Sequence, residues 1–207
     1  MRAKKLYFFI LLVVAAQLLV LKGRGQATGN ADIIEWRAGR KLQLKDYKVI
    51  SDSSTQLALP VAALTRTGIV YYLSTDKVGS KALRVRITIQ ANVHRSHSFL
   101  RKRALKMPVE RQQRLLNHEQ KHFDISEIFA REAARELRML KLSGKFSQEI
   151  RSFVTAKFKA AEAYQHRYDA ETRNGEDFEA QQKWDERIAH RLQQLEAYKN
   201  KVVVRNL

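Results

Sequence analysis

The sequence predicts an α+β protein in which a small antiparallel sheet is followed by three helices. Two observations carry this prediction. Between residues 83 and 93, apolar and polar side chains alternate, which is typical of a strand with one buried face. From residue 108 onward, apolar side chains recur at helical spacing, and no glycine or further proline interrupts them before Gly144. Strands followed by helices along the chain are typical of the α+β class.

The first 27 residues are predicted to be an export segment. They begin with basic side chains, continue with an apolar run over residues 6–21, and end with Gly25 and Ala27 at the spacing of a cleavage site. The run has the length of a signal-peptide core and is short for a membrane span. We therefore expect either a cleaved signal peptide or an N-terminal membrane anchor at 1–27. In both cases the protein is exported, to the bacterial periplasm or beyond it, and residues 28–207 form one domain.

The composition of the chain excludes several classes of site. It has no cysteine, so disulfides, iron–sulfur clusters and thiol nucleophiles are excluded, and any metal site depends on histidine and carboxylate ligands. An exported chain without disulfides is more typical of a bacterial envelope than of an animal extracellular module. The 39 Lys and Arg against 21 Asp and Glu give a net charge of +18, and 34 − 21 = +13 remains without residues 1–27. Export and the lack of a nucleic-acid-reading motif argue against a nucleic-acid partner.

Within the expected domain, residues 28–100 are predicted to be mostly strands and residues 108–199 helical. Beside the alternating segment, residues 68–73 are rich in β-branched and aromatic side chains, and a turn is expected near residues 77–81. Pro108 suits the first position of a helix, because its missing N–H would have no helical partner there. The expected helices are 108–142, 147–172 and 176–199.

The first expected helix contains an HExxH motif, His118-Glu119-Gln120-Lys121-His122. Residues four apart lie one helical turn apart, so His118 and His122 can bind one metal ion while Glu119 lies beside it. Glu119 is the predicted catalytic residue, since it can take a proton from a water that the metal activates. The expected metal is zinc. Because the pattern is short and also arises by chance, its setting in the helix matters.

A helical wheel places the three motif side chains on the apolar face of the helix, together with Leu115 and Phe129. Buried imidazole and carboxylate groups need partners. A metal ion with its water would supply them, and the alternative is a cluster of hydrogen bonds with neighbouring helices. The side chains expected on the opposite, outer face are Lys121, Asp124, Arg131 and Arg135.

A catalytic zinc site needs a third protein ligand. If the first two helices form an antiparallel hairpin about Gly144, His122 comes opposite a segment near residue 166. That segment holds three candidates, Glu171, Asp169 and His166. Ideal helix geometry places Glu171 on the inward arc, Asp169 at its edge and His166 largely outward. We therefore predict Glu171 or Asp169 as the third ligand, with orientation of a ligand imidazole as the alternative role for each.

A longer motif surrounds the HExxH pentapeptide. Residues 116–127 contain the pattern HEQxHFDIxE, and residues 168–175 read Tyr-Asp-Ala-Glu-Thr-Arg-Asn-Gly. Trp36 with the Leu-Gln-Leu-Lys-Asp-Tyr segment, and Gln181 with Trp184, add two further patterns. Together they resemble a bacterial family of exported, uncharacterised proteins that are regarded as zinc-dependent proteases. The resemblance implies membership of the HExxH metallopeptidase clan and a zincin-like domain.

One position departs from the family pattern. Asn174 stands where the family has a histidine before glycine. If that histidine is a metal ligand in relatives, this chain is a weakened or inactive member. If Asp169 or Glu171 is the ligand, nothing essential is missing.

Two classes of function follow. The first is a zinc-dependent metalloprotease that hydrolyses protein or peptide substrates, with the alternating strand as a candidate edge for an extended peptide. The second is a non-catalytic envelope protein that binds its partner through a basic surface and has a degenerate metal site. Association with a membrane would depend on residues 6–21, and the sequence leaves the oligomeric state open.

Overall fold

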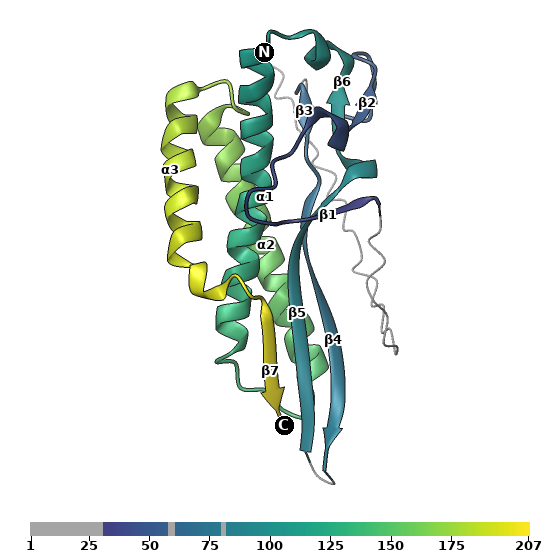
Figure 1. The fold of residues 1–207 in the computed structure, drawn as a ribbon, viewed down its shortest axis with the longest axis vertical. Coiled ribbons are helices and arrows are strands. Elements are labelled where there is room, and N and C mark those ends of the chain that lie inside the picture. The colour runs from purple at the N-terminus through teal and green to yellow at the C-terminus, as the bar shows by residue number, and fades with distance from the viewer. Residues whose placement is uncertain (1–30, 58–60, 80–81) are drawn as a thin grey trace, which may run out of the picture.

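The computed structural model of the protein describes residues 31–57, 61–79 and 82–207. The export segment predicted at residues 1–27 lies outside these ranges. In the part of the chain that is described, no helix is both long and apolar enough to cross a bilayer. The α+β class is confirmed, because an antiparallel sheet precedes and packs against a set of helices (Figure 1).

The main sheet is built around β5 (Ala82–His94), the strand that the alternating pattern predicts. The whole of β4 (Thr67–Val78) pairs with it antiparallel. Two short strands, β1 (Ile33–Glu35) and β7 (Val202–Asn206), share its other edge. The inward side chains of β5 are almost fully buried, which confirms the predicted apolar face; they are Val85, Ile87, Ile89, Ala91 and Val93.

A second, smaller sheet lies beside one end of the first. It consists of β2 (Lys48–Ile50), β6 (Phe99–Arg101) and β3 (Ala63–Leu64), with β2 and β6 parallel. The buried Arg101 guanidinium donates hydrogen bonds to the carbonyl oxygens of Asp52 and Val61 at 2.7 and 3.0 Å. These bonds hold Asp52 and Val61 beside β6. Short 3-10 helices occur at Leu44–Asp46, Arg95–His97, Lys102–Lys106 and Glu196–Tyr198.

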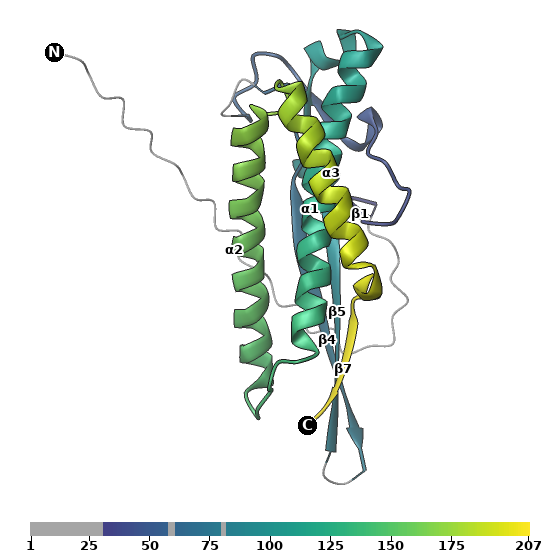
Figure 2. The ribbon, with the colours of Figure 1, turned by 90° about the vertical axis from the view of Figure 1, so that its left-hand side faces the viewer.

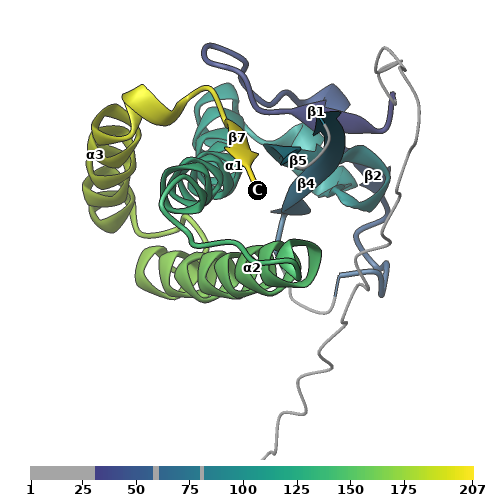
Figure 3. The same cartoon turned by 90° about the horizontal axis from the view of Figure 1, so that it is seen from below.

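The described helices are α1 (Val109–Leu137), α2 (Phe146–Thr172) and α3 (Phe178–Gln194). The expected hairpin of the first two helices is confirmed, since α1 and α2 pack antiparallel about the connection at Gly144 (Figure 2). Seen along its axis, α1 lies between the sheet and the two other helices (Figure 3).

Two boundaries and one strand differ from the sequence prediction. The first helix ends at Leu137 instead of residue 142, and the third at Gln194 instead of residue 199. The strand β7 was not predicted. Its Arg205 donates hydrogen bonds to the carbonyl oxygens of Leu137 and Arg138 at the end of α1. The helix therefore ends where a distant strand satisfies its last carbonyl groups, which no local pattern indicates.

The prediction that Asp124 and Arg131 lie on the outer face of α1 is wrong, because both side chains are buried. The helix is covered on several sides, so its polar side chains meet partners from other elements. Asp124 Oδ1 accepts hydrogen bonds from the Trp36 indole and from the Gln120 amide, both at 2.9 Å. Arg131 pairs with the fully buried Glu127 at 2.8 Å and lies over the Trp36 ring. Gln120 and Asp124 of the HEQxHFD motif thus help to hold the segment around Trp36 against α1.

Candidate metal centre

The two histidines of the motif are buried on the side of α1 that faces α2. Their spacing of four residues places the imidazoles one helical turn apart, with ring centroids at 5.0 Å and planes nearly perpendicular. Glu119 is also buried, and its side chain lines the same cleft as both histidines. The motif therefore gathers two imidazoles and one carboxylate at one place.

Asp169 of α2 completes this cluster. Its Oδ1 atom lies 3.3 Å from His118 Nε2 and 3.0 Å from His122 Nε2. The three side chains form a group with the composition of a metal site. Two ligands on a tetrahedral zinc ion, each at about 2.0–2.1 Å, lie roughly 3.3–3.4 Å apart. The observed separations are therefore close to those of a chelating set.

The other two candidates do not reach the imidazoles. Glu171 accepts hydrogen bonds from Arg167 Nε at 2.6 Å and from the Trp184 indole at 2.9 Å. His166 is exposed at the cleft wall. Of the two carboxylates between which the sequence left the choice open, Asp169 is the one that lies at the imidazoles. The apolar arc of α2 faces α3 as well as α1, and Glu171 lies on the part of it that meets Trp184.

Two glutamines hold the outer edges of the imidazole rings. Gln181 Oε1 lies 3.0 Å from His118 Nδ1, and Gln165 Oε1 lies 3.0 Å from His122 Nδ1. Sequence reasoning gave Gln165 no role, although its position four residues before Asp169 places both on one face of α2. Gln181 entered only through the family resemblance, because α3 had no predicted contact with the motif.

The orientation of the Gln181 amide fixes the tautomer of His118. Gln181 Nε2 donates to the carboxylate of Asp185 at 2.7 Å, so its Oε1 must face His118 and the Tyr168 hydroxyl, which donates to it at 2.9 Å. His118 Nδ1 therefore carries the hydrogen, and Nε2 presents a lone pair toward Asp169. Tyr168 also stacks on the His118 ring at a centroid distance of 4.7 Å. It lies beneath the imidazoles as a packing residue.

The shortest contacts within the cluster join the two Nε2 atoms to Asp169 Oδ1, and no hydrogen lies between these atoms. With their Nδ1 atoms donating to the glutamine oxygens, both neutral imidazoles turn Nε2 lone pairs toward a carboxylate oxygen, which is itself only an acceptor. Such contacts are repulsive unless a cation lies between the atoms or a second proton binds an imidazole. The donor set therefore fits a divalent metal ion.

The ionisation of the metal-free cluster shows the same demand for positive charge. Burial opposes the charge on both groups, but hydrogen bonds and charge attraction outweigh it. The two histidines hold the pKa of Asp169 well below its ordinary value of 3.8. Asp169, followed by Glu119 and Gln165, raises the pKa of His122 above its ordinary 6.5. Without a metal, His122 therefore binds a proton more readily than a free imidazole does.

Glu119 is held by a hydrogen-bond relay from the opposite wall of the cleft. Thr65 Oγ1, in the link between β3 and β4, donates to Glu119 Oε2, and the Tyr47 hydroxyl lies 2.8 Å from Thr65 Oγ1. Burial, followed by the charge of Glu119, raises the pKa of Tyr47 well above its ordinary value. Tyr47 therefore stays protonated, and its hydroxyl donates a hydrogen bond to Thr65 Oγ1. Sequence reasoning missed Thr65, which no motif marks.

The turn between α2 and α3 covers the outer side of His118. Arg173, Asn174 and Gly175 all have positive φ angles, with 81° at Gly175. A Cβ atom on Gly175 would lie 2.9 Å from His118 Cγ, so only glycine allows this approach. Asn174, which departs from the family pattern, suits the left-handed conformation and lines the cleft.

A cleft of about 660 Å³ gives access to the cluster. Residues 61–69 form one wall and α2 forms the other, and His118, Glu119, His122 and Asp169 all line it. An ion at the cluster could therefore meet a molecule in the cleft.

A protein-family model described as "Bacterial protein of unknown function (DUF922)" matches residues 50–177. The match spans β3, β4, β5, β6 and the whole of α1 and α2, and thus all four residues of the cluster. No curated protein and no solved structure matches the chain.

Proposed function

The chain belongs to DUF922, a family of bacterial proteins of unknown function, and we propose that it is a zinc-dependent metallopeptidase of the HExxH clan. The observation that carries this proposal is the convergence of His118 Nε2, His122 Nε2 and Asp169 Oδ1 beside Glu119 in one open cleft. Three protein ligands and an accessible fourth position are the arrangement of catalytic zinc sites.

The residues around the cluster have separate roles in this proposal. His118, His122 and Asp169 would hold the ion, while Gln181 and Gln165 orient the imidazoles. When bound, zinc lowers the pKa of a coordinated water and polarises a carbonyl group.

Glu119 would act as the general base. The bond from Thr65 occupies Glu119 Oε2 and leaves Oε1 to take a proton from the attacking water. Proton transfer to Glu119, followed by its return to the leaving amine, would complete peptide hydrolysis.

The substrate would lie along the wall formed by residues 61–69. We expected the alternating strand, β5, to offer its edge to a peptide, but β5 is paired on both sides. Among the described strands, β4 is at the end of its sheet, and its Thr67, Gly68 and Ile69 line the cleft. An extended peptide can add to such an edge through main-chain hydrogen bonds. Gly68 has open space on its side-chain side, which suits a close approach.

The test is the Glu119→Gln variant of the purified protein. The amide keeps the size of the carboxylate but cannot act as a base, so we expect zinc to remain bound while hydrolysis of a peptide library falls more than about a hundredfold. Glu162→Gln, at the cleft wall but outside the cluster, is the matched control. Equal hydrolysis by wild type and Glu119→Gln would contradict the assignment.

The second candidate is a non-catalytic envelope protein with a basic binding surface. It draws support from the basic residues of the cleft wall, which include Arg66, Arg111 and Arg173, and from Asn174. For this candidate, Glu119→Gln leaves the cellular phenotype intact. The same variant therefore separates the two functions.

We further propose that the protein acts in the bacterial envelope after export. The apolar run at residues 6–21 and the +13 net charge of residues 28–207 support this location. Fractionation of cells would place the protein in the periplasm, the medium or the inner membrane.

A further inference from the structure

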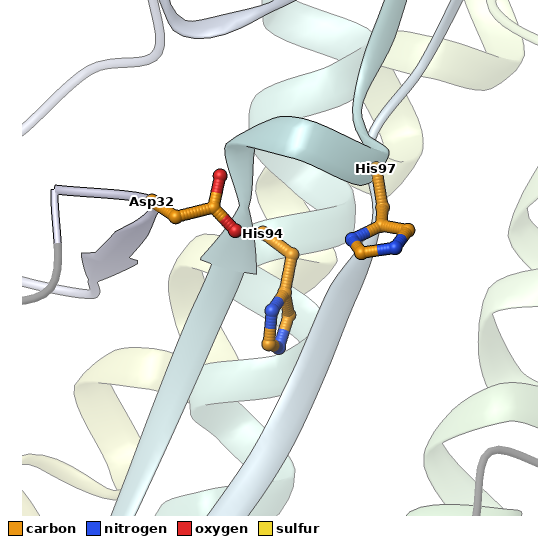
Figure 4. Close-up of side chains that lie close together, drawn as sticks. All are labelled: Asp32, His94 and His97. Carbon is orange, nitrogen blue, oxygen red and sulfur yellow. The ribbon is translucent and has the colours of Figure 1, made fainter.

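A second group of metal-binding side chains lies outside the cleft, at the junction of β1 and β5. Asp32 directly precedes β1, His94 ends β5, and His97 follows in the 3-10 turn Arg95–His97 (Figure 4). One ligand atom from each side chain lies within 4.8 Å of the others. None of the three residues lines the cleft of the first centre. We propose that Asp32, His94 and His97 form a second, separate site for a divalent transition-metal ion such as zinc.

Ser96 positions the carboxylate of this site. Its backbone N–H donates to Asp32 Oδ1 and its hydroxyl donates to Asp32 Oδ2, both at 2.7 Å. A carboxylate offers about four lone-pair sites on its two oxygens, so it can accept hydrogen bonds and bind a cation together. A carboxylate held by two hydrogen bonds loses little conformational freedom when it binds an ion.

The same serine fixes the tautomer of His97. The single hydroxyl hydrogen of Ser96 points to Asp32, so Ser96 Oγ can only accept from His97 Nδ1, which lies 3.0 Å away. His97 Nδ1 therefore carries the hydrogen, and Nε2 keeps the lone pair that a metal requires. The first centre uses the same device, with glutamine oxygens in place of the serine.

The donor set defines the class of ion. Two imidazoles and one carboxylate suit zinc and neighbouring transition metals better than magnesium or calcium, which prefer oxygen ligands. His97 is exposed, so water would fill the remaining coordination positions. The ring centroids of His94 and His97 lie 6.2 Å apart, and rotation of the half-buried His94 side chain would bring its imidazole toward an ion that Asp32 and His97 hold.

The position of the site indicates what the ion would do. Ile33 is paired with His94, and the N–H of Arg95 donates to the Asp32 carbonyl at 2.9 Å. The N–H of His94 in turn donates to the carbonyl of Arg66 at 2.9 Å, next to the Thr65 that holds Glu119. An ion bound here would fasten β1 to β5 beside the wall of the catalytic cleft.

The test is a zinc titration of the untagged, purified protein by calorimetry, with zinc content measured after dialysis. We expect about two zinc ions per chain for wild type and about one for His94→Ala, which retains the first centre. Ser96→Ala should weaken the second binding event by about tenfold or more. His190→Ala, which removes an exposed histidine of α3, is the matched control and should leave both events intact.

The His118→Ala, His122→Ala double variant separates this proposal from the first centre. It should still bind about one zinc ion, and the addition of His94→Ala should abolish that binding. If circular dichroism shows that the double variant is unfolded, the comparison of wild type with His94→Ala decides. Zinc stoichiometry and affinity that are unchanged by both His94→Ala and His97→Ala would overturn the second site, whatever the first centre binds.

Discussion

At the scale of the residue, the candidate centre depends on which atoms carry hydrogen. Asp185 orients the Gln181 amide, the amide sets the tautomer of His118, and the imidazole then turns a lone pair toward Asp169. The HExxH spacing predicted His118, Glu119 and His122, because four residues span one turn of any helix. It could not predict the glutamines, whose role depends on partners from other elements.

The metal-free centre makes the stability of the protein depend on pH at this scale. The pKa of Asp169 is lowered, so its contribution is present above the ordinary value of 3.8 and is lost as the pH falls through the lowered value. The pKa of His122 is raised, so its contribution is complete below 6.5 and is lost as the pH rises through the raised value. Thermal unfolding after chelation should therefore show the largest difference between wild type and Asp169→Asn between pH 3.8 and 6.5. A difference that grows steadily above neutrality would contradict this account.

Gly175 offers a second test on a single residue. Alanine there must adopt a φ of 81° and also displace the His118 ring. We expect Gly175→Ala to lower the free energy of unfolding by more than the roughly 1–2 kcal/mol of left-handed strain and to weaken zinc binding. Gly39→Ala is the control, because Gly39 has a φ of 80° with no atom within 4 Å of its Cβ position. Equal effects of the two variants on zinc affinity would show that the contact with His118 is unimportant.

At the scale of the element, local sequence patterns predicted whether a segment is a helix or a strand better than they predicted where it ends. Alternation identified β5 and helical spacing identified α1, because each period follows from backbone geometry. The strand β7 has only five residues, which is too short for a recognisable strand pattern. It is stabilised by pairing with β5 from Arg84 to Thr88. Asp124 and Arg131 were predicted to be on the outer face of α1, because a helical wheel assumes that only one face of a helix is covered. Both are buried in the structure.

The end of α1 provides the corresponding test. Arg205→Ala removes the hydrogen bonds that β7 makes to the carbonyl oxygens of Leu137 and Arg138. We expect a loss of about 1 kcal/mol in the free energy of unfolding and faster amide exchange in the last turn of α1. Val204→Ala, an exposed position on the same strand, is the control. Exchange in α1 that is equally fast in both variants would contradict a capping role.

At the scale of the whole molecule, the fold brings together groups that are far apart in the sequence. Thr65 and Tyr47 from the sheet region, the motif of α1 and Asp169 of α2 meet at one cleft. The hairpin about Gly144 made it predictable that α2 would face the motif. Its helical phase, and with it the choice of Asp169 over Glu171, depends on the packing of α2 against α3, which the sequence of α2 alone does not contain.

The central claim is that His118, His122 and Asp169 bind one metal ion. Anomalous diffraction at the zinc edge, from crystals of the zinc-loaded protein, tests it most directly. We predict a peak within about 2.0–2.2 Å of His118 Nε2, His122 Nε2 and Asp169 Oδ1. The absence of a peak between these atoms, or a zinc ion there that is bound by Glu171 instead of Asp169, would contradict the claim.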